Sequence, residues 1–101
     1  TLFTWVKTNQ DGSLFKGLGR HTRGNTESCI LATRGQSLPR LNKGIGEAFL
    51  APRERHSKKP DIVRQWIIEL YGDLPRVELF ARCATPGWDV WGNEVESDIV
   101  L

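Results

Sequence analysis

Near the C-terminal end of the chain, a carboxylate and a guanidinium stand four residues apart in an apolar stretch. Glu78 and Arg82 interrupt a run in which Val77, Leu79 and Ala81 take alternate positions, which is the period of an extended strand. A hydrophobic core needs neither charge, and in open α/β sheets the carboxyl ends of strands face the ligand crevice. We therefore expect Glu78 and Arg82 to contact a hydroxylated or charged small molecule. A mutual Glu78–Arg82 ion pair is the alternative.

Two other segments carry polar groups that suit the same ligand. Gly92-Asn93-Glu94 forms a turn-like run after a tryptophan-containing segment. Lys58-Lys59-Pro60 precedes a predicted helix, whose N-terminal N–H groups favour an anion, and Lys59 adds a full positive charge. A pocket with one cationic end and one hydroxyl-binding end is thus predicted from Lys59, Glu78, Arg82, Asn93 and Glu94. An amino acid joined to a ribose has this polarity, although solvated lysines explain the spacing equally well.

One amphipathic helix is predicted over residues 60–72. Pro60 suits the first helical position, Asp61 suits the positive end of the helix dipole, and Gly72 is placed to end the helix. The apolar stripe, which we assign to the core, consists of Ile62, Val63, Trp66, Ile67, Leu70 and Tyr71. The side chains expected to face solvent are Arg64, Gln65 and Glu69.

Strands are expected on both sides of this helix. The predicted ranges are 2–6, 28–33, 48–51 and 77–81, followed by a second short strand before Gly92. We expect strand 2–6 to be covered on both faces and strand 28–33 to be buried, with Glu27 as an exposed charge at its entrance. Helix 60–72 and strand 77–81 form an αβ unit of the kind that builds parallel sheets. The predicted fold class is therefore α/β with a mostly parallel sheet.

Length and charge narrow the possible functions. The chain has 101 residues, enough for one small domain, and no apolar run reaches the roughly 20 residues of a membrane span. Residues 1–59 contain 11 Lys and Arg against 4 Asp and Glu, whereas residues 60–101 contain 3 against 8. The basic, glycine-rich segment 8–26 suits a polyanion, with a solvated excursion as the equal alternative. The candidate phosphate contacts are Lys16, Arg20, Arg23 and Arg40.

No nucleophile–base set or metal site is predicted. His21 and His56 lie among basic residues, which is unsuited to carboxylate-oriented base catalysis. Cys29 and Cys83 lack metal-ligand spacing and are expected to be free thiols, as in a reducing compartment. Gly17-Leu18-Gly19 lacks the third glycine of a dinucleotide fingerprint.

Four segments, in this order, resemble the adenine N-6 methyltransferase family typified by the catalytic subunit of the eukaryotic messenger-RNA adenosine methyltransferase and its bacterial and phage relatives. They are residues 25–35 (NTESCILATRG), 56–61 (HSKKPD), 77–82 (VELFAR), and 86–88 with 92–94 (PGW, GNE). The resemblance implies a Rossmann-like fold that transfers the methyl group of S-adenosyl-L-methionine to the exocyclic amine of adenine in DNA or RNA. In the family pattern the lysine before Pro-Asp, here Lys59, neutralises the methionine carboxylate of the cofactor. Arg82, Asn93 and Glu94 correspond to residues around the ribose and adenine, whereas Cys83-Ala84-Thr85 departs from the polar cofactor contacts of many relatives.

The catalytic Asp-Pro-Pro-Trp segment of that family does not occur in these residues. We therefore expect residues 1–101 to be the C-terminal part of a single methyltransferase domain with a partial Rossmann-like fold, inactive alone. The missing N-terminal part or a second methyltransferase-like subunit would supply that segment. We expect the protein to act in the cytoplasm if it is bacterial or from a phage, and in the nucleus if it is eukaryotic. The alternative is a catalytically silent partner subunit that binds nucleic acid but not S-adenosyl-L-methionine.

Overall fold

The strand β1 (Phe3–Thr8) is the centre of a three-stranded sheet, sheet A, in this computed structural model of residues 1–101. On one side β1 pairs antiparallel with β2 (Thr26–Cys29), and on the other it pairs in parallel with β3 (Ala48–Pro52). The register places Trp5 of β1 between Glu27 of β2 and Phe49 of β3. Trp5 also donates its indole N–H to the carbonyl of Ala51 at 2.8 Å, which fixes the ring against β3.

The helix α1 (Ile62–Tyr71) covers sheet A through one aromatic cluster. The ring of Trp66 lies 5.5 Å from that of Phe3 and 5.0 Å from that of Phe49, between centroids, within the range of favourable aromatic packing. Phe3 is 2% exposed and Leu70, on the last turn of α1, is 6% exposed. The predicted core stripe is therefore confirmed for Trp66 and Leu70, whereas Ile62 at the start of the helix is 42% exposed.

The ends of α1 depart slightly from the sequence-based prediction. The helix begins at Ile62, after Asp61, whose side chain makes no capping hydrogen bond to the backbone. It ends before Gly72, which has φ of 90° and donates its N–H to the carbonyl of Ile68 at 2.7 Å. A positive φ favours glycine, so Gly72 ends the helix as predicted.

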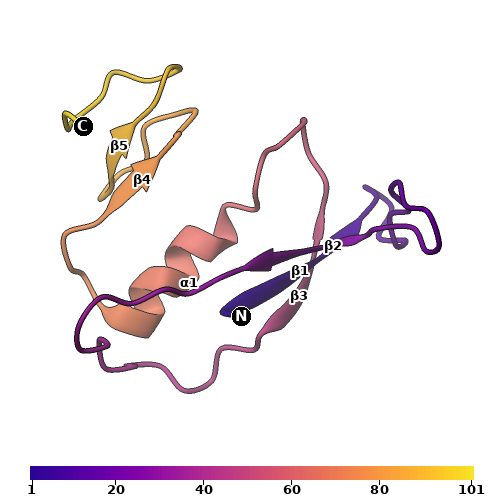
Figure 1. The fold of residues 1–101 in the computed structure, drawn as a ribbon, viewed down its shortest axis with the longest axis horizontal. Coiled ribbons are helices and arrows are strands. Elements are labelled where there is room, and N and C mark those ends of the chain that lie inside the picture. Colours follow the sequence, from indigo (N-terminus) through magenta and orange to yellow (C-terminus); the bar gives the residue numbers. More distant parts are fainter.

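A second sheet, sheet B, follows the helix and consists of β4 (Val77–Leu79) and β5 (Asp89–Trp91), which pair in parallel. Phe80 ends β4 with φ of 59°, and its ring stacks edge-on against Trp91 with centroids 5.3 Å apart. Strand pairing is nevertheless prolonged by Ala81, which donates its N–H to the carbonyl of Trp91 at 3.0 Å. Figure 1 shows β4 and β5 set apart from sheet A, with α1 near both.

The predicted α/β class with one amphipathic helix is confirmed, but the strands form two sheets, of which sheet A is mixed. The antiparallel pair arises because segment 9–25 leaves β1 and reverses the chain, so that β2 returns beside β1 (Figure 1). As an edge strand, β2 is paired on one side only, and the predicted burial of residues 28–33 is wrong. Ile30 is 80% exposed and Leu31 is 47% exposed.

Two further burial predictions are wrong for a related reason. In β1, Phe3 and Trp5 are buried, but Thr4 and Val6 on the opposite face are only half-buried, because α1 covers one face of sheet A. In β4, side chains alternate between two faces as predicted, but the face expected to be buried is the exposed one. Glu78, on the opposite face, points toward Arg64 of α1. Val77 and Leu79 are 42% and 46% exposed on the other side.

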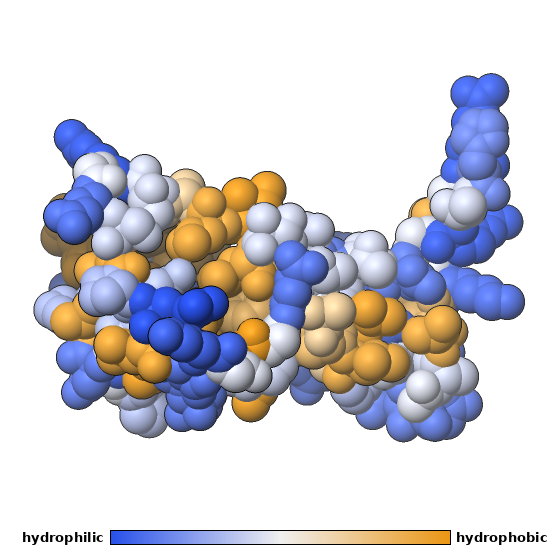
Figure 2. Space-filling view, turned by 90° about the horizontal axis from the view of Figure 1, so that it is seen from below, coloured by the Kyte–Doolittle hydropathy of each residue, from blue (hydrophilic) through white to orange (hydrophobic).

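The surface combines basic and apolar regions. Figure 2 shows hydrophobic patches over the face that it displays, and a hydrophilic projection at the end where Figure 1 places segment 9–25. Only six of the 101 residues are buried, whereas large hydrophobic side chains such as Leu18, Ile30 and Phe80 are at least 78% exposed. The protein contains no helix that is long and apolar enough to span a membrane.

Candidate functional site

The largest hollow of the molecule, which we call the central cleft, lies between the β2 edge of sheet A, the start of α1 and sheet B, and has a volume of about 1010 Å³. Its apolar wall comes from Ile30, Val63, Ile67, Leu79, Phe80 and Trp88. Lys59 and Arg82 both line it, although they belong to different elements. The cleft therefore combines apolar surface with charged groups, including the cationic Lys59 and Arg82.

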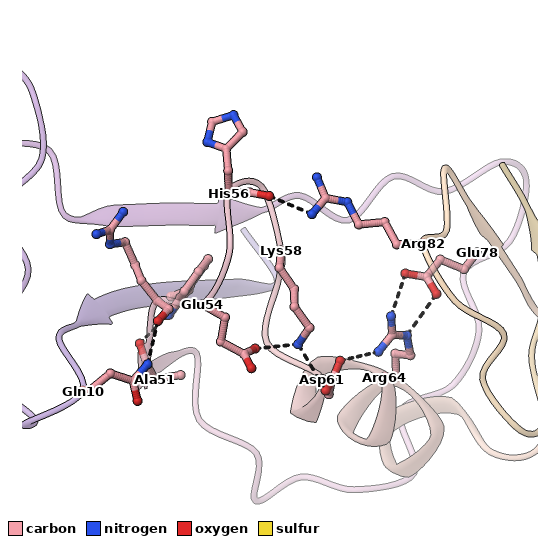
Figure 3. A network of polar contacts seen from close by, with 11 residues as sticks. Gln10, Ala51, Glu54, His56, Lys58, Asp61, Arg64, Glu78 and Arg82 are labelled. Carbon is pink, nitrogen blue, oxygen red and sulfur yellow. Dashed lines mark hydrogen bonds and ion pairs between the residues drawn. The ribbon is translucent and has the colours of Figure 1, made fainter. Parts of the chain in front are cut away.

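A chain of charged side chains ties the loop before α1 to sheet B (Figure 3). Lys58 contacts Glu54 and Asp61, Asp61 accepts from Arg64 at 2.7 Å, and Arg64 continues the chain to Glu78. The hydrogen bond from Arg64 is the main cause that lowers the pKa of Asp61 below its ordinary range. These contacts hold the loop that carries Lys59 against the first turn of α1.

Glu78 lines the cleft, and its partner within the protein is Arg64 rather than Arg82. Arg64 donates its Nε and Nη2 hydrogens to the two carboxylate oxygens of Glu78, each at 3.0 Å. This bidentate bond is the first cause that raises the pKa of Arg64. The prediction that Arg64 faces solvent is wrong, because its guanidinium reaches Glu78 on β4 and its side chain is only 23% exposed. The alternative Glu78–Arg82 pair does not form.

Lys59 and its neighbour Lys58 have different surroundings. Lys58 is held between Glu54 and Asp61, and Glu54 is the first cause that raises its pKa. The side chain of Lys59 is 60% exposed and forms an ion pair with Glu27 on β2. Of the two lysines at the helix entrance, Lys59 is thus the one that a ligand in the cleft can reach.

Glu27 connects Lys59 to β1. Its carboxylate lies 3.2 Å from Lys7 Nζ and also contacts Lys59, and these contacts, chiefly that of Lys59, hold its pKa below the ordinary value. The prediction of an exposed strand-end charge is therefore wrong. The spacing of residues in the sequence does not indicate the contact between Glu27 and Lys7, because that contact depends on the antiparallel pairing of β2 with β1.

Arg82 is oriented from two directions. Its Nη1 donates to the backbone carbonyl of His56 at 2.7 Å, and its Nε lies 3.6 Å from a carboxylate oxygen of Glu94. Asn93 and Glu94 are exposed in the turn after β5 and do not line the central cleft. The structure thus brings Lys59, Glu78 and Arg82 to one cleft. Glu94 lies outside the cleft lining but contacts Arg82.

The four candidate phosphate contacts lie in two places. Lys16, Arg20 and Arg23 are exposed on segment 9–25, which follows β1. Arg40 is exposed beside the other end of α1, where the neighbouring Leu41 donates its N–H to the carbonyl of Leu70 at 2.7 Å. Three of the four residues therefore belong to one basic arm, and Arg40 does not.

Sequence reasoning also missed the position of the two cysteines. Cys29 on β2 and Cys83 after β4 are free thiols, and both line the central cleft. No three His, Cys, Asp or Glu side chains gather in a way that could hold a metal ion.

The site thus combines an α/β framework, a basic arm, and a cleft lined by apolar and charged side chains. The MT-A70 family model matches residues 1–94, and the chain belongs to this family of S-adenosyl-L-methionine-dependent methyltransferases. The resemblance inferred from the four sequence segments is thereby confirmed.

Two curated relatives illustrate the breadth of the family. The chain is 35% identical over 78 residues to the type II methyltransferase M.MunI of a Mycoplasma species, an alignment that covers 76% of the chain and 34% of that protein. It is 30% identical over 93 residues to the N6-methyladenosine RNA methyltransferase MTA1 of Cryphonectria parasitica, covering 92% of the chain and 27% of that protein. The chain thus spans about a third or less of the length of these relatives.

Proposed function

We propose that residues 1–101 form the C-terminal part of a single S-adenosyl-L-methionine-dependent domain that methylates the exocyclic amine of adenine in DNA or RNA. The observation that carries this proposal is the convergence of Lys59 and Arg82 on the central cleft of a chain that belongs to the MT-A70 family.

The side chains around the cleft suit this cofactor. S-adenosyl-L-methionine has a carboxylate at one end and an adenosine at the other, and supplies an electrophilic methyl group when bound. Lys59, at the mouth of α1, neutralises the carboxylate. Arg82 lines the cleft on the ribose and adenine side, and the turn with Asn93 and Glu94, outside the cleft lining, is linked to it through the Arg82–Glu94 ion pair. Glu78 accepts a hydroxyl hydrogen bond with the lone pairs that Arg64 leaves free.

The proposal that the chain is part of a larger Rossmann-like domain is supported by its uncovered apolar side chains. Leu50 on β3 is 67% exposed and Phe80 after β4 is 78% exposed. Soluble domains normally bury such side chains, and the matched parts make up only 34% and 27% of the two relatives. In this proposal, further polypeptide joins sheets A and B into one sheet.

The residues of this chain bind and orient, but do not hold the target amine. Methyl transfer to an amine needs its lone pair placed in line with the methyl group within a polar cradle. The Asp-Pro-Pro-Trp sequence that serves this purpose in the family is not among residues 1–101. Another part of the protein or a second methyltransferase-like subunit supplies it, and residues 1–101 alone do not turn over.

The experiment is methyl transfer by the complete gene product from radiolabelled S-adenosyl-L-methionine to adenine-containing DNA and RNA oligonucleotides. N6-methyladenine in the digested product, identified by mass spectrometry, is the expected result. A gene product that binds oligonucleotides but neither binds nor consumes the cofactor contradicts the proposal and favours the catalytically silent partner subunit.

A further inference from the structure

A second, smaller hollow, which we call the polar pocket, lies where β1 and β3 end side by side. It has a volume of about 180 Å³, less than the roughly 300–1000 Å³ of typical small-molecule sites, and therefore suits one small ionic group. Nine of its ten lining residues are polar or charged. They include five lysine and arginine side chains (Lys7, Arg53, Arg55, Lys58 and Lys59) against two glutamates (Glu27 and Glu54).

The two carboxylates of the polar pocket are already paired. Glu27 contacts Lys7 and Lys59, and Glu54 contacts Lys58. Arg53 and Arg55 have no carboxylate within 4.0 Å, so the pocket keeps two uncompensated guanidinium groups. A guanidinium presents several N–H donors in one plane and matches the oxygens of a phosphate.

The backbone of both arginines is fixed in place. Arg53 donates its N–H to the carbonyl of Thr8 at 2.9 Å and accepts from the Gln10 side chain at 2.9 Å. The carbonyl of Arg55 accepts from the N–H of Lys58 at 3.1 Å, in a turn where Ser57 has φ of 61°. A left-handed serine is strained, and such strain often accompanies a functional site.

The polar pocket is continuous with both other parts of the site. Arg55, Ser57, Lys58 and Lys59 line it and the central cleft alike, so the two hollows share a wall. In the other direction, the guanidinium of Arg53 lies 3.7 Å from the ring centre of Phe15, the residue next to Lys16 of the basic arm. A strand of nucleic acid following this basic surface would pass from the arm to the rim of the cleft.

We infer that the polar pocket binds a backbone phosphate of the nucleic acid, through Arg53 and Arg55, beside the place where the target base enters the central cleft. This inference rests on the proposed function and deepens it. Arg53 and Arg55 thereby join Lys16, Arg20 and Arg23 in one phosphate-binding track. The same phosphate chemistry would also admit free phosphate or a mononucleotide, and the experiment separates these sources.

The test is fluorescence anisotropy of a labelled single-stranded oligonucleotide with the purified gene product, at several salt concentrations. Arg53→Gln and Arg55→Gln should each weaken binding about tenfold, and each should reduce the slope of log affinity against log salt by about 0.7. Lys43→Gln is the matched control, because Lys43 is exposed, lines none of these hollows and loses the same charge. Arg53→Lys should recover part of the loss, and unchanged thermal melting excludes misfolding as its cause.

Two results would overturn the inference. One is oligonucleotide binding by Arg53→Gln and Arg55→Gln equal to that of Lys43→Gln. The other is saturable binding of inorganic phosphate or adenosine 5′-monophosphate that is tighter than that of the oligonucleotide.

Calorimetry with S-adenosyl-L-homocysteine tests the proposed function separately, because Arg53 does not line the central cleft and its substitution should leave binding of this cofactor product unchanged. If the cofactor product fails to bind but the arginine variants lose nucleic acid, the proposed function fails and the phosphate site stands.

Discussion

Arg64 on α1 and Glu78 on β4 are joined by two hydrogen bonds of 3.0 Å each. Their side chains are 23% and 29% exposed, so water competes only partly for this pair. Because the pair bridges the helix and sheet B, it holds the two sides of the central cleft at a fixed separation. The geometry of the proposed cofactor site thus depends on a contact that the ligand itself does not make.

The first prediction concerns this pair. Arg64→Ala and Glu78→Gln should each destabilise the protein, and the double variant should be less destabilised than the sum, with a coupling energy of about 1–2 kcal/mol. Urea unfolding of the wild type and the three variants measures the cycle. Strict additivity would show that the pair does not connect α1 to sheet B.

A second prediction concerns the turn that follows β5. A Cβ added at Gly92 would lie 2.6 Å from the carbonyl oxygen of Ala81, which is itself buried and part of the β4–β5 connection. Gly92→Ala should therefore lower the free energy of unfolding by about 1–3 kcal/mol and displace Asn93 and Glu94. Gly12→Ala is a useful contrast, because a Cβ there meets nothing within 4 Å and only its φ of 88° opposes the change. Equal stability losses in the two variants would argue against close packing at Gly92.

The third prediction is a pH dependence. Lys59, and to a lesser degree Lys7, hold the pKa of Glu27 below its ordinary value of 4.5. A carboxyl whose pKa is lower in the folded state stabilises the protein above its unfolded pKa, and this contribution disappears as the pH falls through the folded pKa. The difference in unfolding free energy between the wild type and Glu27→Gln should therefore be larger at about pH 6 than at about pH 3. A difference that stays constant with pH would show that the ion pairs of Glu27 do not stabilise the fold.

The elements that have local sequence signals could be predicted. Burial and ion pairs that depend on tertiary contacts between elements could not. The amphipathic helix α1 and its terminating Gly72 follow from local periodicity and backbone preference, and both were predicted correctly. The roles of Arg64 and Glu27 could not be predicted, because each depends on a strand brought beside it by the tertiary fold. The exposed face of β4 was mispredicted because alternation indicates two faces but not which one is covered.

The candidate site was predictable in part for the same reason. That Lys59 precedes a helix and that Arg82 follows a strand can be inferred from the sequence, and the structure places both in one cleft. The positions of Arg53 and Arg55 beside the end of β1 result from the parallel pairing of β1 and β3, which no local pattern indicates.

A fourth prediction uses the two cysteines as reporters of the central cleft. Cys29 and Cys83 both line it and are free to react. S-adenosyl-L-homocysteine at ten times its dissociation constant should slow alkylation of both thiols by iodoacetamide about tenfold, in proportion to the unliganded fraction. The control is the urea-unfolded protein, in which the ligand should have no effect. Unprotected thiols in a protein that demonstrably binds the ligand would place the cofactor outside the central cleft.

The most direct measurement is calorimetric titration of S-adenosyl-L-methionine into the purified gene product and its Lys59→Ala, Arg82→Ala and Lys43→Ala variants. We predict that the wild type and Lys43→Ala bind alike, and that Lys59→Ala and Arg82→Ala each bind about 1–3 kcal/mol more weakly, because each loses a charge-assisted contact. Wild-type affinity in both cleft variants would contradict the assignment of the central cleft as the cofactor site.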